Sequence, residues 1–160
     1  MAARLTLSDY RALAEFRFQI RRFLGFSERA ARASGLDPRQ HQLLLALKGL
    51  PDRTEPTIGE LARRLQVEHH SAVEMVDRLE RRRLVSRLRD ETDKRRVLVR
   101  LTTRGDALLG ALSLSHRQEL CAAAPALVQV LNGVIDGRRG PAKPRADRLH
   151  RGRVSALASK

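Results

Sequence analysis

Residues 61–105 read LARRLQVEHHSAVEMVDRLERRRLVSRLRDETDKRRVLVRLTTRG, and the spacing of the apolar residues changes along this stretch. In its first half they recur with the period of amphipathic helices, whereas near the end Val97, Val99 and Leu101 alternate with other residues, as in a half-buried strand. The pattern predicts helices over 57–66 and 70–82 and strands near 84–89 and 96–101. Two helices followed directly by a hairpin predict a mainly α fold with a small β-hairpin, a winged helix-turn-helix.

Charge gathers on the predicted hairpin and at the end of the chain. The chain carries 32 Lys and Arg against 18 Asp and Glu, a formal net charge of +14, which favours a polyanionic partner. Residues 137–160 hold eight of these bases against one aspartate, a net of +7, and are expected to form a flexible tail. Because Arg- and Ala-rich usage can also reflect genome composition, charge alone does not establish nucleic-acid binding.

The flanking segments are predicted to be helical. Residues 8–34 hold every aromatic residue of the chain, on more than one helix face, so this helix is expected either to pack on a partner as well as on its own core or to serve the core alone. Asp37 and Pro38 are typical of a helix start, with Gln40 completing a capping box. The Leu/Ala-rich segment after residue 102 is expected to kink or restart at Pro125.

The order of motifs within 61–105 resembles the multiple-antibiotic-resistance regulator (MarR) family. After the helix-turn-helix come V-D-R-L-E, L-V-x-R, a D-x-R wing tip and L-T-x-x-G, here Val76–Glu80, Leu84–Arg87, Asp93–Arg95 and Leu101–Gly105. The resemblance extends over roughly residues 8–136. It implies dimerisation helices at 1–36 and 102–136, a DNA-binding lobe at 37–101, and a basic tail at 137–160 outside the family pattern.

This resemblance implies a homodimeric, cytoplasmic transcriptional regulator, a repressor, that binds a palindromic double-stranded DNA operator. Arg95 would reach a minor groove, oriented by Asp93. The candidate DNA-binding residues are His69, His70, Ser71, Val73, Glu74, Arg78, Arg87, Lys94, Arg95 and Arg96. Alternatives are a winged helix that binds nucleic acid non-specifically through its tail, and a protein-interaction module.

Three departures from the family pattern bear on the second predicted helix. Glu68 stands where relatives have Ser or Thr and is a poor N-cap. Glu74 is expected to pair with Arg78, although a glutamate can also accept a hydrogen bond from cytosine. Arg83 replaces the glycine that commonly ends this helix, and it would be strained there if the backbone is left-handed.

Other chemistry finds little support in the sequence. Neither a nucleophile motif, a phosphate loop nor a metal-binding cluster occurs, so we expect no enzyme, metal or cofactor. A small aromatic or phenolic anion is a possible effector, and its candidate contacts are Phe16, Arg17, Ile20, Phe23, His41 and Leu44. Core packing is the alternative for these residues. Cys121, the single cysteine, is expected to be buried, and no stretch reaches the roughly 18 apolar residues of a membrane span.

Overall fold

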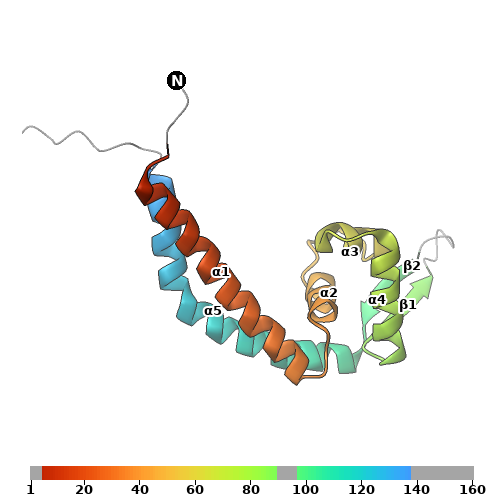
Figure 1. The fold of residues 1–160 in the computed structure, drawn as a ribbon. Helices are drawn as coiled ribbons and strands as arrows, with labels where there is room; N and C mark the ends of the chain where they lie inside the picture. Colours follow the sequence, from red (N-terminus) through yellow and green to blue (C-terminus); the bar gives the residue numbers. More distant parts are fainter. Residues whose placement is uncertain (1–4, 90–96, 138–160) are drawn as a thin grey trace, which may run out of the picture.

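The computed structural model describes residues 5–89 and 97–137 and contains a winged helix with two long flanking helices (Figure 1). In chain order the elements are α1 (Leu7–Ala33), α2 (Pro38–Lys48), α3 (Ile58–Leu65), α4 (His69–Arg81), β1 (Val85–Arg89), β2 (Val97–Leu101) and α5 (Thr103–Gly137). The lobe comprises α2, α3, α4 and the hairpin, while α1 and α5 pack on each other and project away from it. The predicted fold class is confirmed.

Local sequence signals set the ends of the first two helices. Thr6 caps α1 in a capping box with Asp9, whose carboxylate accepts hydrogen bonds from the Thr6 backbone N–H and hydroxyl, each at 2.7 Å. These bonds lower the pKa of Asp9. Asp37 caps α2, and Gln40 completes the box as predicted. Gly35 follows α1 with a φ of 73°, a left-handed conformation that glycine adopts without strain.

The hairpin pairs β1 and β2 in antiparallel register, from Val85 opposite Leu101 to Arg89 opposite Val97. Val99, in the middle of β2, is fully buried, and its backbone N–H donates to the carbonyl of Pro56 at 2.8 Å. The loop before α3 therefore adds a short edge to the sheet. These contacts hold the base of the wing against the lobe.

The hydrophobic core lies in the lobe and at its contact with the flanking helices. Its most buried large side chains are Leu36, Leu43, Leu44, Leu61, Val76, Leu79, Leu84, Val85 and Val99. Helix α2 is central, because it contacts α1, α3, α4, α5 and β2. The position of the winged helix relative to α1 and α5 is thus set mainly through α2.

Helix α5 differs from two sequence expectations. It runs unbroken from Thr103 through Pro125 to Gly137, so of the expected kink or restart at Pro125 the restart is wrong, and Figure 1 shows the helix curving along its length. A proline removes one backbone hydrogen bond, here to the carbonyl of Cys121, and contacts with α1 keep the remaining helix in place. Cys121 is exposed, which corrects the expectation of a buried thiol. It lies outside the core because few side chains of α5 face the lobe.

The expectation that no segment has the length of a membrane span also needs correction. In α5, Thr103–Ile135 is 33 residues long and reaches a mean hydropathy of 1.2, enough to cross a membrane by length and composition. Only 6% of its most apolar window is buried in this chain. The reason is that Leu and Ala dominate a helix whose charges are few. Length and composition do not distinguish a span from a helix covered by another protein chain.

Candidate nucleic-acid interface

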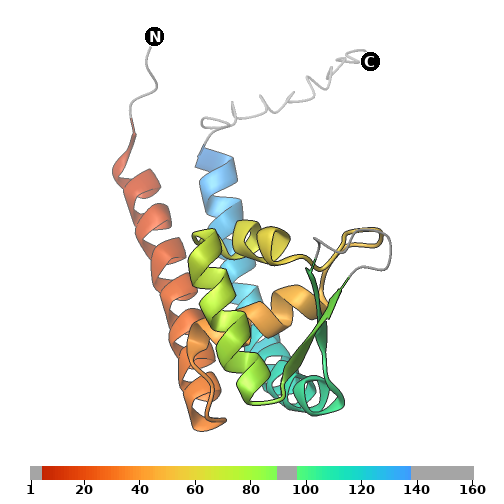
Figure 2. The ribbon, with the colours of Figure 1, turned by 90° about the vertical axis from the view of Figure 1, so that its right-hand side faces the viewer.

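Helix α4 lies on the side of the lobe that faces away from α1 and α5 (Figures 1 and 2). Its inner face is apolar and buried, through Ala72, Met75, Val76 and Leu79. Val73, one of the candidate DNA-binding residues, is partly buried, because Ala72 and Met75 fill the contact with the lobe. The outer face is therefore available to a ligand along most of its length.

The candidate DNA-binding residues of α4 differ in exposure. His69 and His70 are exposed at its start, whereas Ser71 is half-buried. Ser71 lines a cavity of about 300 Å³ between α4 and the start of α2, together with Arg39 and Arg78. His69 and His70 are thus exposed at the start of α4, whereas Ser71 is half-buried and shares a cavity with Arg39 and Arg78.

The poor N-cap expected at Glu68 and the ion pair expected between Glu74 and Arg78 are both present in α4. Glu68 occupies the N-cap without a side-chain hydrogen bond to the helix, as its poor capping propensity predicts. Glu74 and Arg78 form the predicted ion pair at 3.5 Å, with side chains 64% and 60% exposed. An exposed pair one helical turn apart contributes only about 0.3–0.5 kcal/mol. A phosphate or base can therefore displace it at little cost.

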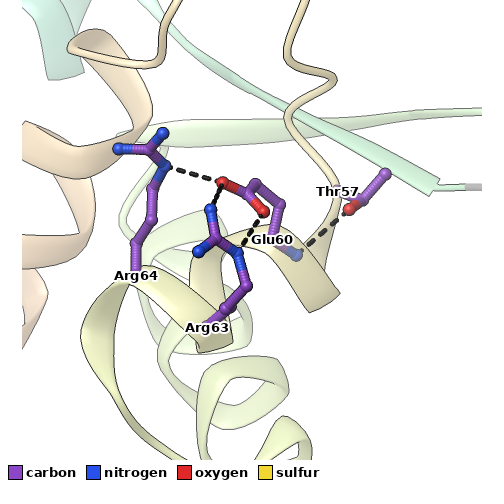
Figure 3. Close-up of polar contacts among 4 residues, drawn as sticks. All are labelled: Thr57, Glu60, Arg63 and Arg64. Carbon is purple, nitrogen blue, oxygen red and sulfur yellow. Dashed lines mark hydrogen bonds and ion pairs between the residues drawn. The ribbon is translucent and has the colours of Figure 1, made fainter.

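Thr57 and Glu60, three residues apart at the start of α3, have the spacing that predicts a capping box. The Thr57 hydroxyl accepts from the Glu60 backbone N–H at 3.2 Å, but the Glu60 carboxylate does not return to the cap (Figure 3). It instead accepts two hydrogen bonds from Arg63, at 2.7 and 2.8 Å, and one from Arg64 at 2.8 Å. The bonds from Arg63, followed by those from Arg64, lower the pKa of Glu60 to about 2. The predicted capping box is therefore half formed, because two neighbouring guanidinium groups compete for the carboxylate.

Two left-handed residues shape the ends of the helix-turn-helix. Gln66 ends α3 with a φ of 54°, and Val67 then donates to the carbonyl of Ala62 at 3.1 Å, which closes the tight turn before α4. Arg83 follows α4 with a φ of 57°, so the left-handed backbone considered from the sequence is present. A non-glycine residue there carries strain. The role of Gln66 has no clear sequence signal, since glutamine is not a typical left-handed residue.

Arg87 on β1 is joined to α4 by two carboxylates. Its guanidinium donates to Asp77 Oδ1 at 2.5 Å and to Glu80 Oε2 at 2.6 Å, while its backbone N–H donates to Glu80 Oε1 at 3.1 Å. Burial opposes the charge of Arg87, but the bonds to Asp77 and Glu80 outweigh it and raise its pKa. Among the candidate DNA-binding residues, Arg87 is thus already occupied within the protein. Its position fixes the wing to α4, and Asp77 and Glu80 are positioning residues that sequence reasoning missed.

Comparisons with known proteins agree with this geometry. Residues 34–96 match the MarR family. This part of the chain, which includes α2, α3, α4 and β1, is similar to that family. The solved structures of this family reported below are transcription regulators, in agreement with the expectation that the chain is not an enzyme. No curated protein matches the chain by sequence.

The fold extends the likeness to the flanking helices. MepR, a transcription regulator of the Staphylococcus aureus multidrug efflux pump MepA, superposes with a TM-score of 0.63 at 20% identity, over 84% of this chain and 94% of that chain. The S. aureus MepR–DNA complex gives a TM-score of 0.56 at 21% identity, over 76% and 96%. AbsC, a MarR family transcriptional regulator from Streptomyces coelicolor, gives 0.64 at 18% identity, over 87% and 99%. At these identities the likeness establishes the fold.

The tip of the MarR-type wing lies outside the described residues. Asp93, Lys94, Arg95 and Arg96 all belong to this segment, so their predicted contacts remain predictions. The described ends of the hairpin are Arg89 on β1 and Val97 on β2, which pair with each other.

The candidate effector residues of this MarR-type chain are not gathered on one surface. Leu44 is fully buried in the core and His41 is 3% exposed, whereas Arg17 and Ile20 are exposed on α1. The other two, Phe16 and Phe23, are half-buried on the same helix. In this single chain His41 and Leu44 are packing residues, and an effector could reach only the α1 members.

Proposed function

We propose that the protein is a homodimeric MarR-type repressor that binds a palindromic DNA operator in the cytoplasm. The observation that carries this proposal is the exposure of His69 and His70 at the start of α4, a helix against which strand β1 of the hairpin packs. In winged helices the second helix of the motif enters the major groove and presents its first residues to base edges. The surplus of bases supplies contacts to phosphate.

The proposed dimer is supported by the apolar surface of the two flanking helices. Large apolar side chains are exposed along both, namely Leu7, Tyr10, Leu13, Phe18, Ile20 and Leu24 on α1 and Leu114, Leu120, Val128, Leu131 and Ile135 on α5. Leaving these in water is unfavourable by about 25 cal/mol for each Å² of apolar surface, so a second copy that covers them is strongly stabilised. Two-fold symmetry would then place two α4 helices for half-sites about 34 Å apart.

Release of the operator by a small aromatic anion is a further part of the proposal. The ligand would contact the half-buried Phe16 on α1, with the exposed Arg17 as its counter-charge. To act, it must bind more tightly to an arrangement of the recognition helices that does not fit the operator. Benzoate is a suitable probe, and an increase in the DNA dissociation constant on its addition is the expected result.

The decisive experiment is selection of bound sequences from random duplexes, followed by titration of the selected DNA. We expect an inverted repeat to emerge and to bind at least about 10³-fold more tightly than random DNA at physiological salt. Arg95→Ala should weaken binding and flatten the dependence of log affinity on log salt by about 0.9. Arg11→Ala, on exposed α1 far from the lobe, is the charge-matched control. Selection without any enriched repeat, or unchanged binding by Arg95→Ala, would contradict the proposal.

A second candidate function, non-specific nucleic-acid binding, is favoured by one observation. Residues 137–160 carry a net charge of +7, half of the total. If this segment supplies most of the affinity for DNA, deletion of 138–160 should abolish most of the binding to every duplex alike. In the MarR-type proposal the same deletion lowers affinity equally for all sequences and leaves the preference for the selected repeat intact.

A further inference from the structure

Two histidines stack where the winged helix meets the flanking helices. His41 of α2 and His116 of α5 have ring centroids 4.6 Å apart and ring planes 23° from parallel. Phe26 of α1 packs edge-on against His116 at 5.7 Å, and Phe23 does so at 6.4 Å. His41 is only 3% exposed. Three helices thus meet at a pair of titratable rings.

The hydrogen bonds show which protonation state this arrangement fits. His116 Nδ1 lies 2.6 Å from the carbonyl oxygen of Leu112, to which it donates, and Nε2 lies 2.8 Å from the Ser27 hydroxyl, which can donate or accept. Both ring nitrogens of His116 therefore have a partner. His41 Nε2 is buried and has no hydrogen-bond partner among the described residues. A proton added there would create a buried charge without an acceptor.

Within residues 5–89 and 97–137, no acidic side chain acts on His41 to compensate an added charge. Burial, followed by repulsion from His116, lowers the pKa of His41. From α1 the facing groups are Phe23, Phe26 and Ser27, none of which is charged. The nearest acid preceding His41 in sequence is Asp37, whose carboxylate accepts from the backbone N–H of Arg39.

The acid nearest to His116 on α5 is Glu119, one turn further along the helix and beside Arg117. Neither residue acts as a hydrogen-bond partner of His116, whose two ring nitrogens are bound to Leu112 and Ser27. For His41, therefore, the neutral state is the one that the structure stabilises.

We propose that His41 and His116 form a proton-sensitive joint between the winged helix and the α1–α5 pair, so that mild acid loosens this contact and weakens DNA binding. The effect on DNA rests on the function proposed above. The physical reason is that α2 carries His41 at the centre of the lobe, while His116 and its aromatic neighbours belong to the helices that would set the spacing of the two lobes in a dimer. When the joint opens, water reaches the rings and can solvate the added charge.

The direction of the effect follows from proton linkage. Because His41 has a lower pKa in the closed joint than in water, its contribution to stability is complete above about pH 6.5 and is lost as the pH falls below that value. At pH 5.5, one unit lower, the equilibrium ratio of open to closed joint rises by up to about tenfold.

The test compares the full-length protein with His41→Phe, which keeps an aromatic ring in the stack and cannot be protonated. Imidazole NMR resonances are titrated, thermal midpoints are measured at pH 7.5 and 5.5, and binding of the selected duplex is followed by fluorescence anisotropy at both values. We expect His41 to titrate below 6.5. We also expect the midpoint and the affinity to fall in acid, the affinity by up to tenfold, and His41→Phe to remove most of both losses. His70→Gln, a change at an exposed histidine, is the control and should leave the pH dependence of the midpoint unchanged.

Two outcomes overturn the proposal: titration of His41 at 6.5 or above, or equal changes in midpoint for the wild type and His41→Phe. If His41→Phe fails to fold, the NMR titration of the native protein decides the matter. Failure to bind any duplex at either pH would refute the proposed function and the predicted effect on DNA. The titration and the melting data would still decide whether the joint senses protons.

Discussion

The substitution Gly105→Ala tests the contact on which the start of α5 depends. A Cβ atom at Gly105 would lie 1.9 Å from the carbonyl oxygen of Leu84 and 2.9 Å from its carbonyl carbon. Atoms that are not bonded do not approach so closely, and both partners are backbone, so no side-chain rotation can relieve the clash. Helix α5 and the segment that enters β1 would have to separate.

The magnitude follows from what holds the two segments. Leu84 donates its N–H to Leu79 at 3.0 Å and accepts from the Thr102 N–H at 3.1 Å, while Gly105 donates to the Thr102 hydroxyl at 3.0 Å. Overpacking costs about 1–3 kcal/mol, and the loss of one such bond about 1 kcal/mol. The better helix propensity of alanine offsets about 1 kcal/mol of this loss in the free energy of unfolding. We expect a net loss of about 1–3 kcal/mol and a fall in the thermal midpoint of about 3–10 °C.

The matched control is Gly110→Ala on the same helix. Gly110 is exposed, and a Cβ atom there meets nothing within 4 Å, so only the gain in helix propensity remains. Its midpoint should rise by about 2–4 °C. Both variants are measured by urea unfolding and by thermal melts followed by circular dichroism. A Gly105→Ala midpoint at or above that of the wild type, with Gly110→Ala stabilised, would refute the steric argument.

Three further substitutions probe the lobe. Arg83→Gly should raise the thermal midpoint by about 2–4 °C, because glycine relieves a φ of 57° that costs about 1 kcal/mol; an unchanged midpoint would argue against strain at this residue. Glu60→Gln should lower the thermal midpoint at neutral pH, because it removes the ion pairs of the Glu60 carboxylate. The difference from the wild type should vanish as the pH falls from 4.5 to about 2, since a carboxylate of lowered pKa contributes fully to stability only above 4.5. A difference in midpoint that stays constant across this range would exclude the ion pairs as its cause. Arg87→Ala should lower both the free energy of unfolding and the affinity for DNA. A double-mutant cycle with Asp77→Ala should give a coupling free energy on the order of 1 kcal/mol. Strictly additive losses of stability would show that this ion pair does not hold the wing.

Several features of the lobe were predictable because they depend on residues close together in the chain. Asp37, Pro38 and Gln40 predict the start of α2, and the alternation of Val97, Val99 and Leu101 predicts β2. The Glu74–Arg78 ion pair follows from a spacing of four on a helix. The same local logic misjudged Glu60, because helix spacing also brings Arg63 and Arg64 to its carboxylate.

Other features depend on which distant segments meet. The sequence marks Arg87 as a candidate for phosphate contact, and only the packing of β1 on α4 reveals Asp77 and Glu80 around it. The exposure of Cys121 likewise follows from which face of α5 meets α1, and apolar neighbours in the sequence do not specify that face.

The sequence by itself determined a winged helix-turn-helix of MarR type, because motif order, helix caps and strand alternation are all local. The tertiary structure alone decided that His41 stacks on His116, that Gly105 touches Leu84, and that α1 and α5 keep an apolar surface uncovered. The physical reason is that each of these contacts joins residues distant in the chain, and hydrophobic burial is non-directional. Periodicity shows which residues seek burial, whereas the surface they bury against depends on the packing of the whole chain.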